Sequence, residues 1–241
     1  HTFSQYGSGT FDNVPTYLSQ FVYVNPLLLL KEYKLLKRIL TDVPKVFVNN
    51  KALVNTAYHA IVNQARELSL GKERHGSCGV GVGATREYSI LNPDALKWED
   101  INCENVSKYT HFKSKLKDIR QWAFEEIAKL NQPELLKDMF TYLSDNEEFN
   151  TTLDVFYKIK DLLTTSVNSL QDIVNRFAVM SDKVDRYIVF EGAQGVLLDE
   201  KWGKAPYHTW SNTTDENAHT ILSEVKVEGF VEVNNSEILG I

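Results

Sequence analysis

The chain contains 241 residues, of which 43% are hydrophobic and 24% charged, enough apolar material for one large domain or two small ones. Its formal net charge of -6 excludes a general nucleic-acid-binding surface, which needs clustered Lys and Arg. Cys78 and Cys103 are too few for a disulfide framework, and no Cys or His spacing indicates a zinc site. A reduced, cytoplasmic setting fits best.

The two ends of the sequence predict a piece of a longer polypeptide. The chain begins at His1 without an initiator Met or a signal peptide, and it stops at Ile241 inside what reads as a strand or an entering helix. The longest apolar run, from Val22 to Leu30, is interrupted by Asn25-Pro26 and is too short to span a bilayer. We therefore expect no membrane partner.

Residues 1–106 predict an α/β arrangement. Thr2 to Thr16 has the Gly, Ser and Asn content of a loop. Asn25-Pro26 is a good helix start, because Asn caps a helix well and Pro fits its first turn. The expected order is strand, helix, strand and helix, which favours layered α/β packing: Phe21–Val24, Leu27–Ile39, Lys45–Val48 and Ala52–Leu70. A single His on a helix, such as His59, is more often structural than functional.

A glycine-rich segment follows that second helix. Gly76, Gly79, Gly81 and Gly83 alternate with small residues, so backbone N–H groups can face an anion there, with Arg74 and Arg86 as flanking positive charges. Composition alone is equally compatible with a flexible surface loop. The segment lacks the strand and helix setting of a dinucleotide fingerprint, and the phosphate-loop pattern GxxxxGK[ST] is absent from the sequence.

Residues 107–180 predict a helical subdomain. Apolar residues recur at helical spacing, and Asn131-Gln132-Pro133 and Ser144-Asp145-Asn146 separate three expected helices: Lys108–Leu130, Pro133–Leu143 and Leu153–Val179. We thus divide the chain into an α/β nucleotide-binding part (1–106), this helical subdomain (107–180) and a return to the sheet (181–241). Val225–Val233 alternates as a late hairpin or edge strand does.

The return to the sheet carries the most informative motif. The β-branched and aromatic run Tyr187–Phe190 predicts a buried strand, and the turn Glu191–Gly195 then places Gln194 at its carboxyl end, where open α/β sheets bind ligands. The amide of Gln194 can read a carbonyl or a purine edge. The cluster Trp210–Thr214 suits phosphate oxygens, although the same composition is common in ordinary turns and helix caps.

Several blocks, in order along the chain, resemble adenylosuccinate synthetases, and among them FEGAQG with the downstream SNTT is the most specific. The other blocks are Gly7-Ser8-Gly9, Asn25-Pro26 with its Leu-rich helix, Tyr58-His59 followed by Asn63 to Glu67, and the Gly76–Gly83 loop. The resemblance implies a mainly parallel sheet flanked by helices, related to GTPases of the phosphate-loop class, with helical subdomains attached. It also implies a homodimer.

The resemblance implies a ligase that joins L-aspartate to C6 of IMP with GTP (or ATP) and Mg²⁺, through a 6-phosphoryl intermediate. Gln194 matches the glutamine that steadies the purine 6-oxygen, and it is the implied catalytic residue. Thr209 matches a hydroxyl that holds the 5′-phosphate. The remaining implied nucleotide-binding residues are Ser77, Cys78, Gly79 and Arg86. No residue is assigned to a metal.

Departures from the family pattern leave alternatives open. Cys78 stands where the family has a Thr, and Val80 stands where it has an Arg. The family's GDEGKGK and Gly-His-Thr loops, which carry the main triphosphate site and the catalytic His, have no match here, so we expect this polypeptide alone to be inactive. Its loop sequences are closer to a shorter branch that includes 2-aminoadenylosuccinate synthetases acting on dGMP. The other alternative is a non-catalytic nucleotide-binding domain.

Overall fold

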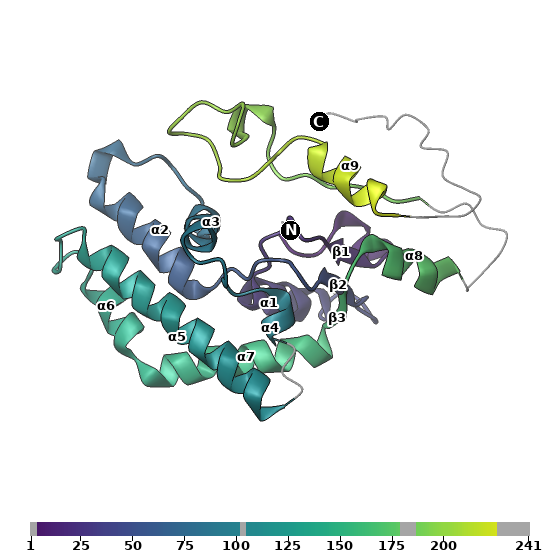
Figure 1. Ribbon diagram of the computed structural model, residues 1–241, viewed down its shortest axis with the longest axis horizontal. Helices are drawn as coiled ribbons and strands as arrows, with labels where there is room; N and C mark the ends of the chain where they lie inside the picture. The colour runs from purple at the N-terminus through teal and green to yellow at the C-terminus, as the bar shows by residue number, and fades with distance from the viewer. Residues whose placement is uncertain (1–3, 102–104, 179–186, 226–241) are drawn as a thin grey trace.

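The computed structural model describes residues 4–101, 105–178 and 187–225, which form a small parallel sheet with helices around it (Figure 1). The strands are β1 (Thr16–Leu18), β2 (Val46–Asn49) and β3 (Thr164–Val167). The α-helices of these residues are α1 (Pro26–Leu36), α2 (Ala57–Ser69), α3 (Val82–Leu91), α4 (Trp98–Ile101), α5 (Val106–Ala128), α6 (Lys137–Ser144), α7 (Asn146–Leu162), α8 (Leu170–Ala178) and α9 (Glu216–Ser223). Short 3-10 turns are η1 (Ser8–Asp12), η2 (Gly71–Glu73) and η3 (Val196–Leu198).

The sheet has the order β1-β2-β3, and both of its strand pairs are parallel. Val46 pairs with Thr16 on one side and Thr164 on the other, so β2 is the central strand. All four of its residues are buried, as expected for a parallel strand that is covered on both faces. This confirms the predicted α/β class with a parallel sheet.

Local sequence signals explain where the first helices begin. The side chain of Asn25 accepts the backbone N–H of Leu28 at 3.1 Å and so caps α1, with Pro26 in the first turn, as predicted. Thr56 caps α2, and the side chain of His59 accepts the backbone N–H of Thr56 at 3.1 Å, which completes a reciprocal capping box. His59 is 1% exposed. It is therefore part of the scaffold of α2.

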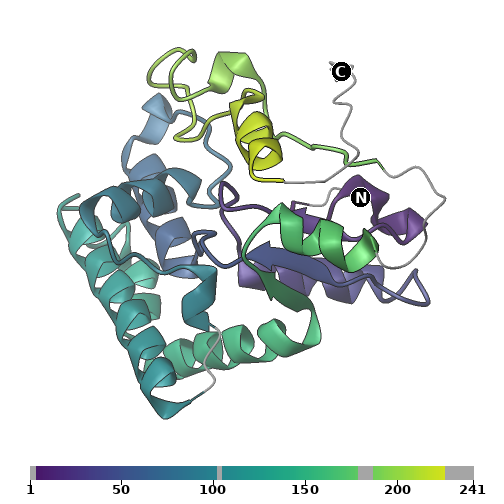
Figure 2. The same cartoon turned by 45° about the vertical axis from the view of Figure 1, so that its right-hand side comes forward.

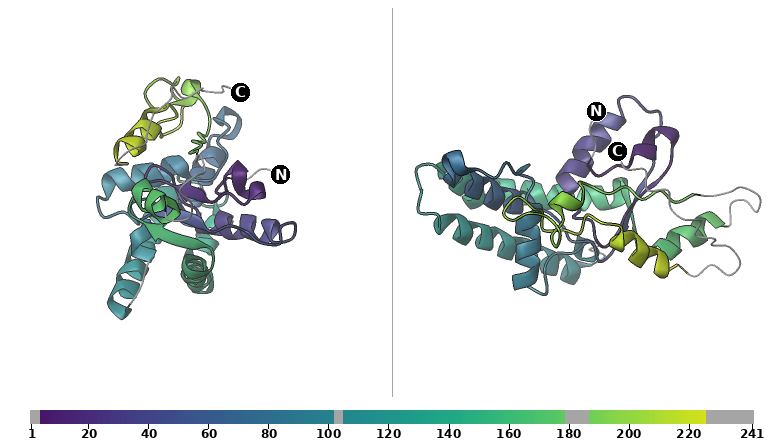
Figure 3. Two further views of the ribbon diagram at one scale, coloured as in Figure 1. Left: turned by 90° about the vertical axis from the view of Figure 1, so that its right-hand side faces the viewer. Right: turned by 90° about the horizontal axis from the view of Figure 1, so that it is seen from above.

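The helices α5, α6 and α7 pack around α2 and α1. Five apolar residues of α5 recur every three or four positions and are buried, mostly on the side that meets α2: Phe112, Leu116, Ile119, Ala123 and Ile127. Figures 1 and 3 show α7 on one side of the body and α9, with the stretch before it, on the opposite side. Within the predicted helical subdomain 107–180, α5 follows the predicted helix Lys108–Leu130 closely, and α6 starts at Lys137, later than the predicted Pro133.

Several sequence predictions are wrong in detail. Leu153–Val179 is not one helix, because β3 interrupts it and pairs with β2. Phe21–Val24 is not a strand, since β1 lies earlier at Thr16–Leu18 and Val24 makes only an isolated bridge to Val54. Tyr187–Phe190 is exposed and belongs to no strand among the residues that the structure describes, so Gln194 does not follow a buried strand.

Three further expectations concern a late strand, the division of the chain and its relation to membranes. The predicted strand at Val225–Val233 lies almost wholly outside the described residues. The division at 106 and 180 stays a prediction, with β3 belonging to the sheet. Within the part of the chain that the structure describes, every helix is too short or too polar to cross a membrane.

Candidate functional site

The glycine-rich segment forms a loop between α2 and α3. Gly76, Gly79 and Gly81 have φ angles of 79°, 71° and 91°, in the left-handed region that favours glycine. Gly81 also has no room for a side chain, because a Cβ atom there would lie 2.5 Å from the backbone nitrogen of Ala60 and 2.6 Å from the carbonyl carbon of His59. The end of the loop is thus pinned against the first turn of α2.

Three side chains on one face of α2 hold the rest of this loop. Asn63 accepts the hydroxyl of Ser77 at 2.8 Å, and the amide of Gln64 donates to the carbonyl of Gly79 at 2.9 Å. One turn further along, the carboxylate of Glu67 accepts the backbone N–H of Gly76 at 3.1 Å. These contacts give a physical role to the block Asn63 to Glu67 that the sequence singled out.

Some of the loop residues proposed for nucleotide binding already form hydrogen bonds within the protein. The hydroxyl of Ser77 accepts the backbone N–H of Gly79 at 3.1 Å, which leaves that N–H committed within the loop. The thiol of Cys78 is free and exposed. An incoming phosphate would therefore meet the outer surface of the loop, at Ser77 and Cys78, and would have to displace an internal hydrogen bond to reach the N–H of Gly79.

The stretch from residue 190 to 214 is organised by Asp199. This carboxylate is fully buried and accepts three backbone N–H groups, from Thr213 at 2.7 Å, Lys201 at 2.8 Å and Trp202 at 3.2 Å. These bonds hold the pKa of Asp199 below its usual value, and the bond from Thr213 has the largest effect. Asp199 therefore closes a compact loop between Leu198 and Thr213.

This loop brings Trp210, the neighbour of Thr209, beside the glycine segment. The N–H of Thr209 donates to the carbonyl of Leu198 at 2.7 Å, inside the loop that Asp199 closes. Its neighbour Trp210 lies over Gly83, where a Cβ atom would be 3.9 Å from the indole ring. The rings of His75 and Tyr207 meet edge to face at 6.0 Å between centroids. Figures 1 and 2 show the part of this stretch that precedes α9 on the same side of the body as the loop between α2 and α3.

Gln194 occupies a different position from the one predicted. It lies in an exposed turn with φ of 70°, a left-handed conformation that is uncommon for a residue with a side chain. Its amide makes no hydrogen bond to any residue that the structure describes. Three residues earlier, the carboxylate of Glu191 accepts the backbone N–H of Ser8 at 3.0 Å and also its hydroxyl. Gln194 thus stands near the segment Gly7-Ser8-Gly9, with its amide free.

Arg86 is half-buried on α3, and its guanidinium forms no ion pair or hydrogen bond with the described residues. Burial raises the pKa of the Tyr23 phenol, the positive charge of Arg86 opposes that rise, and Glu200 adds to it. Arg86 and Glu200 thus both lie close enough to Tyr23 to affect its ionisation. An uncommitted guanidinium at this junction suits an anionic ligand.

A network of buried amide and hydroxyl groups connects the start of α1 to the start of α3, and the sequence analysis did not predict it. The amide of Asn25 donates to Asn55 at 2.7 Å, and Asn55 donates to the hydroxyl of Thr85 at 2.8 Å. Thr85 in turn donates to the carbonyl of Gly81 at 2.9 Å. The network ties the caps of α1 and α3 together. Asn25, Asn55 and Thr85 are each ordinary helix-cap or turn residues when read alone, so no sequence signal predicts the network.

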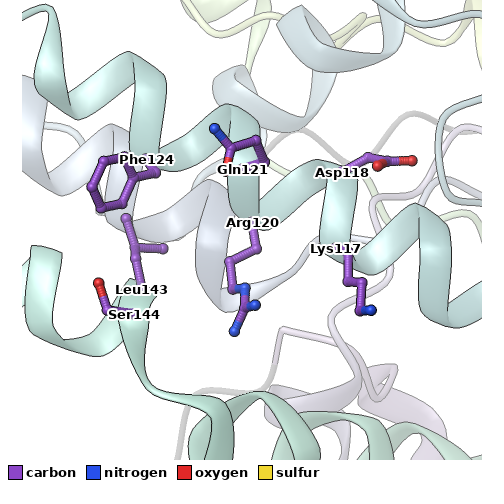
Figure 4. A pocket seen from close by; sticks show the side chains of 7 residues that line it. All are labelled: Lys117, Asp118, Arg120, Gln121, Phe124, Leu143 and Ser144. Atoms are coloured by element: carbon purple, nitrogen blue, oxygen red, sulfur yellow. The ribbon is translucent and has the colours of Figure 1, made fainter.

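Other features of the described residues lie apart from this junction. A pocket between α5 and α6 is lined by Lys117, Asp118, Arg120, Gln121, Phe124, Leu143 and Ser144 (Figure 4). None of the residues proposed for nucleotide binding lines it. In the described part of the chain, no three His, Cys, Asp or Glu side chains are placed together to hold a metal ion.

Comparison with known proteins gives one consistent result. A family model described as adenylosuccinate synthetase matches residues 1–234. The adenylosuccinate synthetase of Vibrio parahaemolyticus is 28% identical over 204 residues, covering 84% of this chain and 42% of the relative. That of Buchnera aphidicola is 29% identical over 211 residues, covering 85% and 43%. The chain therefore spans less than half the length of these relatives.

A solved structure agrees on the fold. The fully ligated adenylosuccinate synthetase from Plasmodium falciparum superposes with a TM-score of 0.56 at 21% sequence identity. The match covers 90% of this chain and 45% of the Plasmodium chain. At that identity the likeness establishes a shared fold.

Proposed function

Because this chain belongs to the adenylosuccinate synthetase family, we propose that its glycine loop and its 190–214 stretch together bind a purine nucleoside monophosphate for a carbon–nitrogen ligase. The reaction is the joining of L-aspartate to C6 of IMP in purine biosynthesis, with GTP as the phosphoryl donor. dGMP in place of IMP, and ATP in place of GTP, are the alternatives. The whole protein acts as a cytoplasmic homodimer in this proposal.

One observation carries the proposal. The family resemblance implies that Thr209 and the glycine loop both contact the nucleotide phosphate, and they lie on segments, distant in the sequence, that pack together through Trp210 and Gly83. A hydroxyl, a glycine-rich backbone and the uncommitted guanidinium of Arg86 are donors suited to a phosphate. The phosphate would thus bind between the loop and the stretch.

Gln194 supplies the second part of the proposal. Its free amide can donate to the purine 6-oxygen, which gains negative charge when the bond to C6 is activated. The left-handed backbone at this exposed position costs about 1 kcal/mol for a residue with a side chain. A glycine at this exposed turn would avoid the strain, so the presence of Gln194 supports a function for its side chain.

The residues present do not fit a Mg²⁺–triphosphate site. The sequence has no GxxxxGK[ST] loop, and the described residues offer no cluster of carboxylates for a metal. We therefore assign residues 1–241 no role in binding Mg²⁺ or the triphosphate. We expect residues 1–241 to bind the nucleoside monophosphate without turnover, and turnover by the purified polypeptide would contradict this expectation.

Calorimetric titration with IMP and with dGMP tests the proposal. We expect one of the two to bind. Thr209→Val should weaken binding about 10-fold or more, since a hydrogen bond to a charged phosphate contributes roughly 1.5–3 kcal/mol. Gln194→Ala should weaken it about 2- to 10-fold, since the 6-oxygen of the free nucleotide is neutral and such a bond contributes roughly 0.5–1.5 kcal/mol. Thr220→Val is the matched control, because that hydroxyl is exposed on α9 and donates only to the carbonyl of Glu216. Absence of binding by both nucleotides would contradict the proposed function of this chain.

A second candidate is a nucleotide-binding domain without catalysis. The observation that favours it is the pair Cys78 and Val80, which replaces a hydroxyl and a guanidinium of the family loop with groups that bind phosphate poorly. Equal binding of IMP, dGMP and inorganic phosphate would support this candidate, because a site without Gln194 contacts has no means to read the base.

A further inference from the structure

Tyr23 ties one half of the proposed site to the body of the protein, although nothing in the sequence marked it. It follows β1 by five positions, is half-buried, and its hydroxyl donates to the carbonyl of Trp210 at 3.1 Å. The two residues are 187 positions apart. This hydrogen bond attaches the 199–213 loop to the segment between β1 and α1.

Few other contacts anchor that loop to the body. Trp210 rests on Gly83 of α3, and Tyr207 meets the ring of His75 edge to face. Trp202, Tyr207 and Trp210 are 69%, 59% and 44% exposed, so their burial does little to fix the loop. Asp199 holds the loop together internally, but none of its bonds reaches the rest of the protein.

The position of Trp210 also determines the position of Thr209. The two residues are adjacent in the chain, so the carbonyl that Tyr23 holds is one residue away from the hydroxyl assigned to the phosphate. Tyr23 further lies within electrostatic reach of Arg86, the cation assigned to the same phosphate. The hydrogen bond from Tyr23 therefore constrains the backbone directly next to Thr209.

We propose that Tyr23 is a positioning residue, which holds the Trp210 carbonyl so that Thr209 stays against the glycine loop and α3. The assignment rests on the proposed function, because it gives Tyr23 a role toward the nucleotide through Thr209. Tyr23 itself need not touch the ligand. Its hydroxyl donates to the Trp210 carbonyl and so acts on the backbone next to Thr209.

Tyr23→Phe tests the proposal, because it removes one hydroxyl and keeps the ring. Amide hydrogen exchange should become at least 5-fold faster in residues 199–213 and stay unchanged in α5 and α7. The loss of one neutral hydrogen bond, about 1 kcal/mol, corresponds to this factor. Tyr142→Phe is the matched control, since Tyr142 is also half-buried but lies on α6, away from this loop. Unchanged exchange in 199–213 would overturn the proposal.

A double-mutant cycle separates positioning from a purely structural role. We expect Tyr23→Phe to weaken nucleotide binding 3- to 10-fold, and Tyr23→Phe combined with Thr209→Val to bind no more weakly than Thr209→Val alone. Additive losses would overturn the positioning role even if the exchange result holds. If the unmodified chain binds neither IMP nor dGMP, the proposed function fails, whereas the exchange result still decides whether Tyr23 holds the loop.

Discussion

The carboxylate of Glu191 binds both the backbone N–H and the hydroxyl of Ser8, two residues that are 183 positions apart in the chain. Gly7 lies at the same point, where a Cβ atom would be 3.7 Å from a Glu191 oxygen and 3.2 Å from the hydroxyl of Thr16. The contact places the turn that contains Gln194 beside the N-terminal end of η1. Two segments of the family resemblance, Gly7-Ser8-Gly9 and FEGAQG, are thus joined directly.

We predict that Glu191→Ala loosens this turn with little effect on global stability. The contact is exposed, and surface substitutions usually change the free energy of unfolding by no more than about 0.5 kcal/mol, which corresponds to about 1–2 °C in Tm for a chain of this size. Amide exchange in residues 187–195 should accelerate, because the turn loses its attachment to Ser8. Glu200→Ala is the control, and equal acceleration in both variants would contradict the prediction.

We predict that two substitutions distinguish the effect of the strained Gln194 backbone on stability from the effect of its side-chain amide on binding. Gln194→Gly removes the strain of the left-handed backbone but raises the conformational entropy of the unfolded chain. The two effects oppose each other, so the free energy of unfolding should stay within about 1 kcal/mol of the parent value. Gln194→Ala keeps the strain. Both variants lack the amide, so both should bind IMP or dGMP about 2- to 10-fold more weakly in calorimetric titration. Normal binding by Gln194→Gly would show that the amide is not used.

Local signals in the sequence predicted α1, α2 and α5, whereas α3 and α9 were not predicted, and β3 was missed because pairing between distant segments decides it. Asn25, Pro26 and the α5 stripe act within a few residues of where they stand, so α1 and α5 follow from the sequence. The strand β3 is Thr-Thr-Ser-Val, with no strong apolar pattern, and it becomes a strand because β2 pairs with it. Tyr187–Phe190 has the composition of a strand but no partner among the described strands.

The candidate site could be predicted only in part for the same reason. The motif that contains Gln194 and Thr209 also contains Glu191 and Asp199, but their roles depend on Ser8 and on backbone N–H groups that the sequence does not identify as partners. Tyr23 lies in a segment that looked like a plain strand. Its hydroxyl matters because Trp210 comes to lie beside it.

We predict that Gly81→Ala is far more destabilising than Gly76→Ala. Both residues have positive φ, so each substitution introduces backbone strain of about 1–2 kcal/mol. At Gly76 a Cβ atom meets nothing within 4 Å, whereas at Gly81 it would overlap the backbone of Ala60 and His59. Urea unfolding should show a difference of more than about 2 kcal/mol between the two variants. Similar free energies of unfolding would mean that the loop is not pinned to α2.

We predict that His59 makes stability depend on pH. Burial lowers its pKa to about 3, whereas an unfolded His titrates near 6.5. The unfolded chain therefore binds a proton that the folded chain does not, and stability that is complete above pH 6.5 is lost as the pH falls toward 3. At pH 5 this loss amounts to about 2 kcal/mol.

The measurement for His59 is urea unfolding at pH 7.5 and pH 5. His59→Gln cannot titrate, so its loss of stability between the two pH values should be about 2 kcal/mol smaller than that of the unmodified chain, whatever the absolute stability of the variant. His219→Gln is the control, because His219 is exposed on α9 and its pairing with Asp215 at 3.3 Å contributes at most about 1 kcal/mol. Equal losses in His59→Gln and the unmodified chain would mean that His59 accepts a proton in the folded protein, and its role in the cap of α2 would then have to be abandoned.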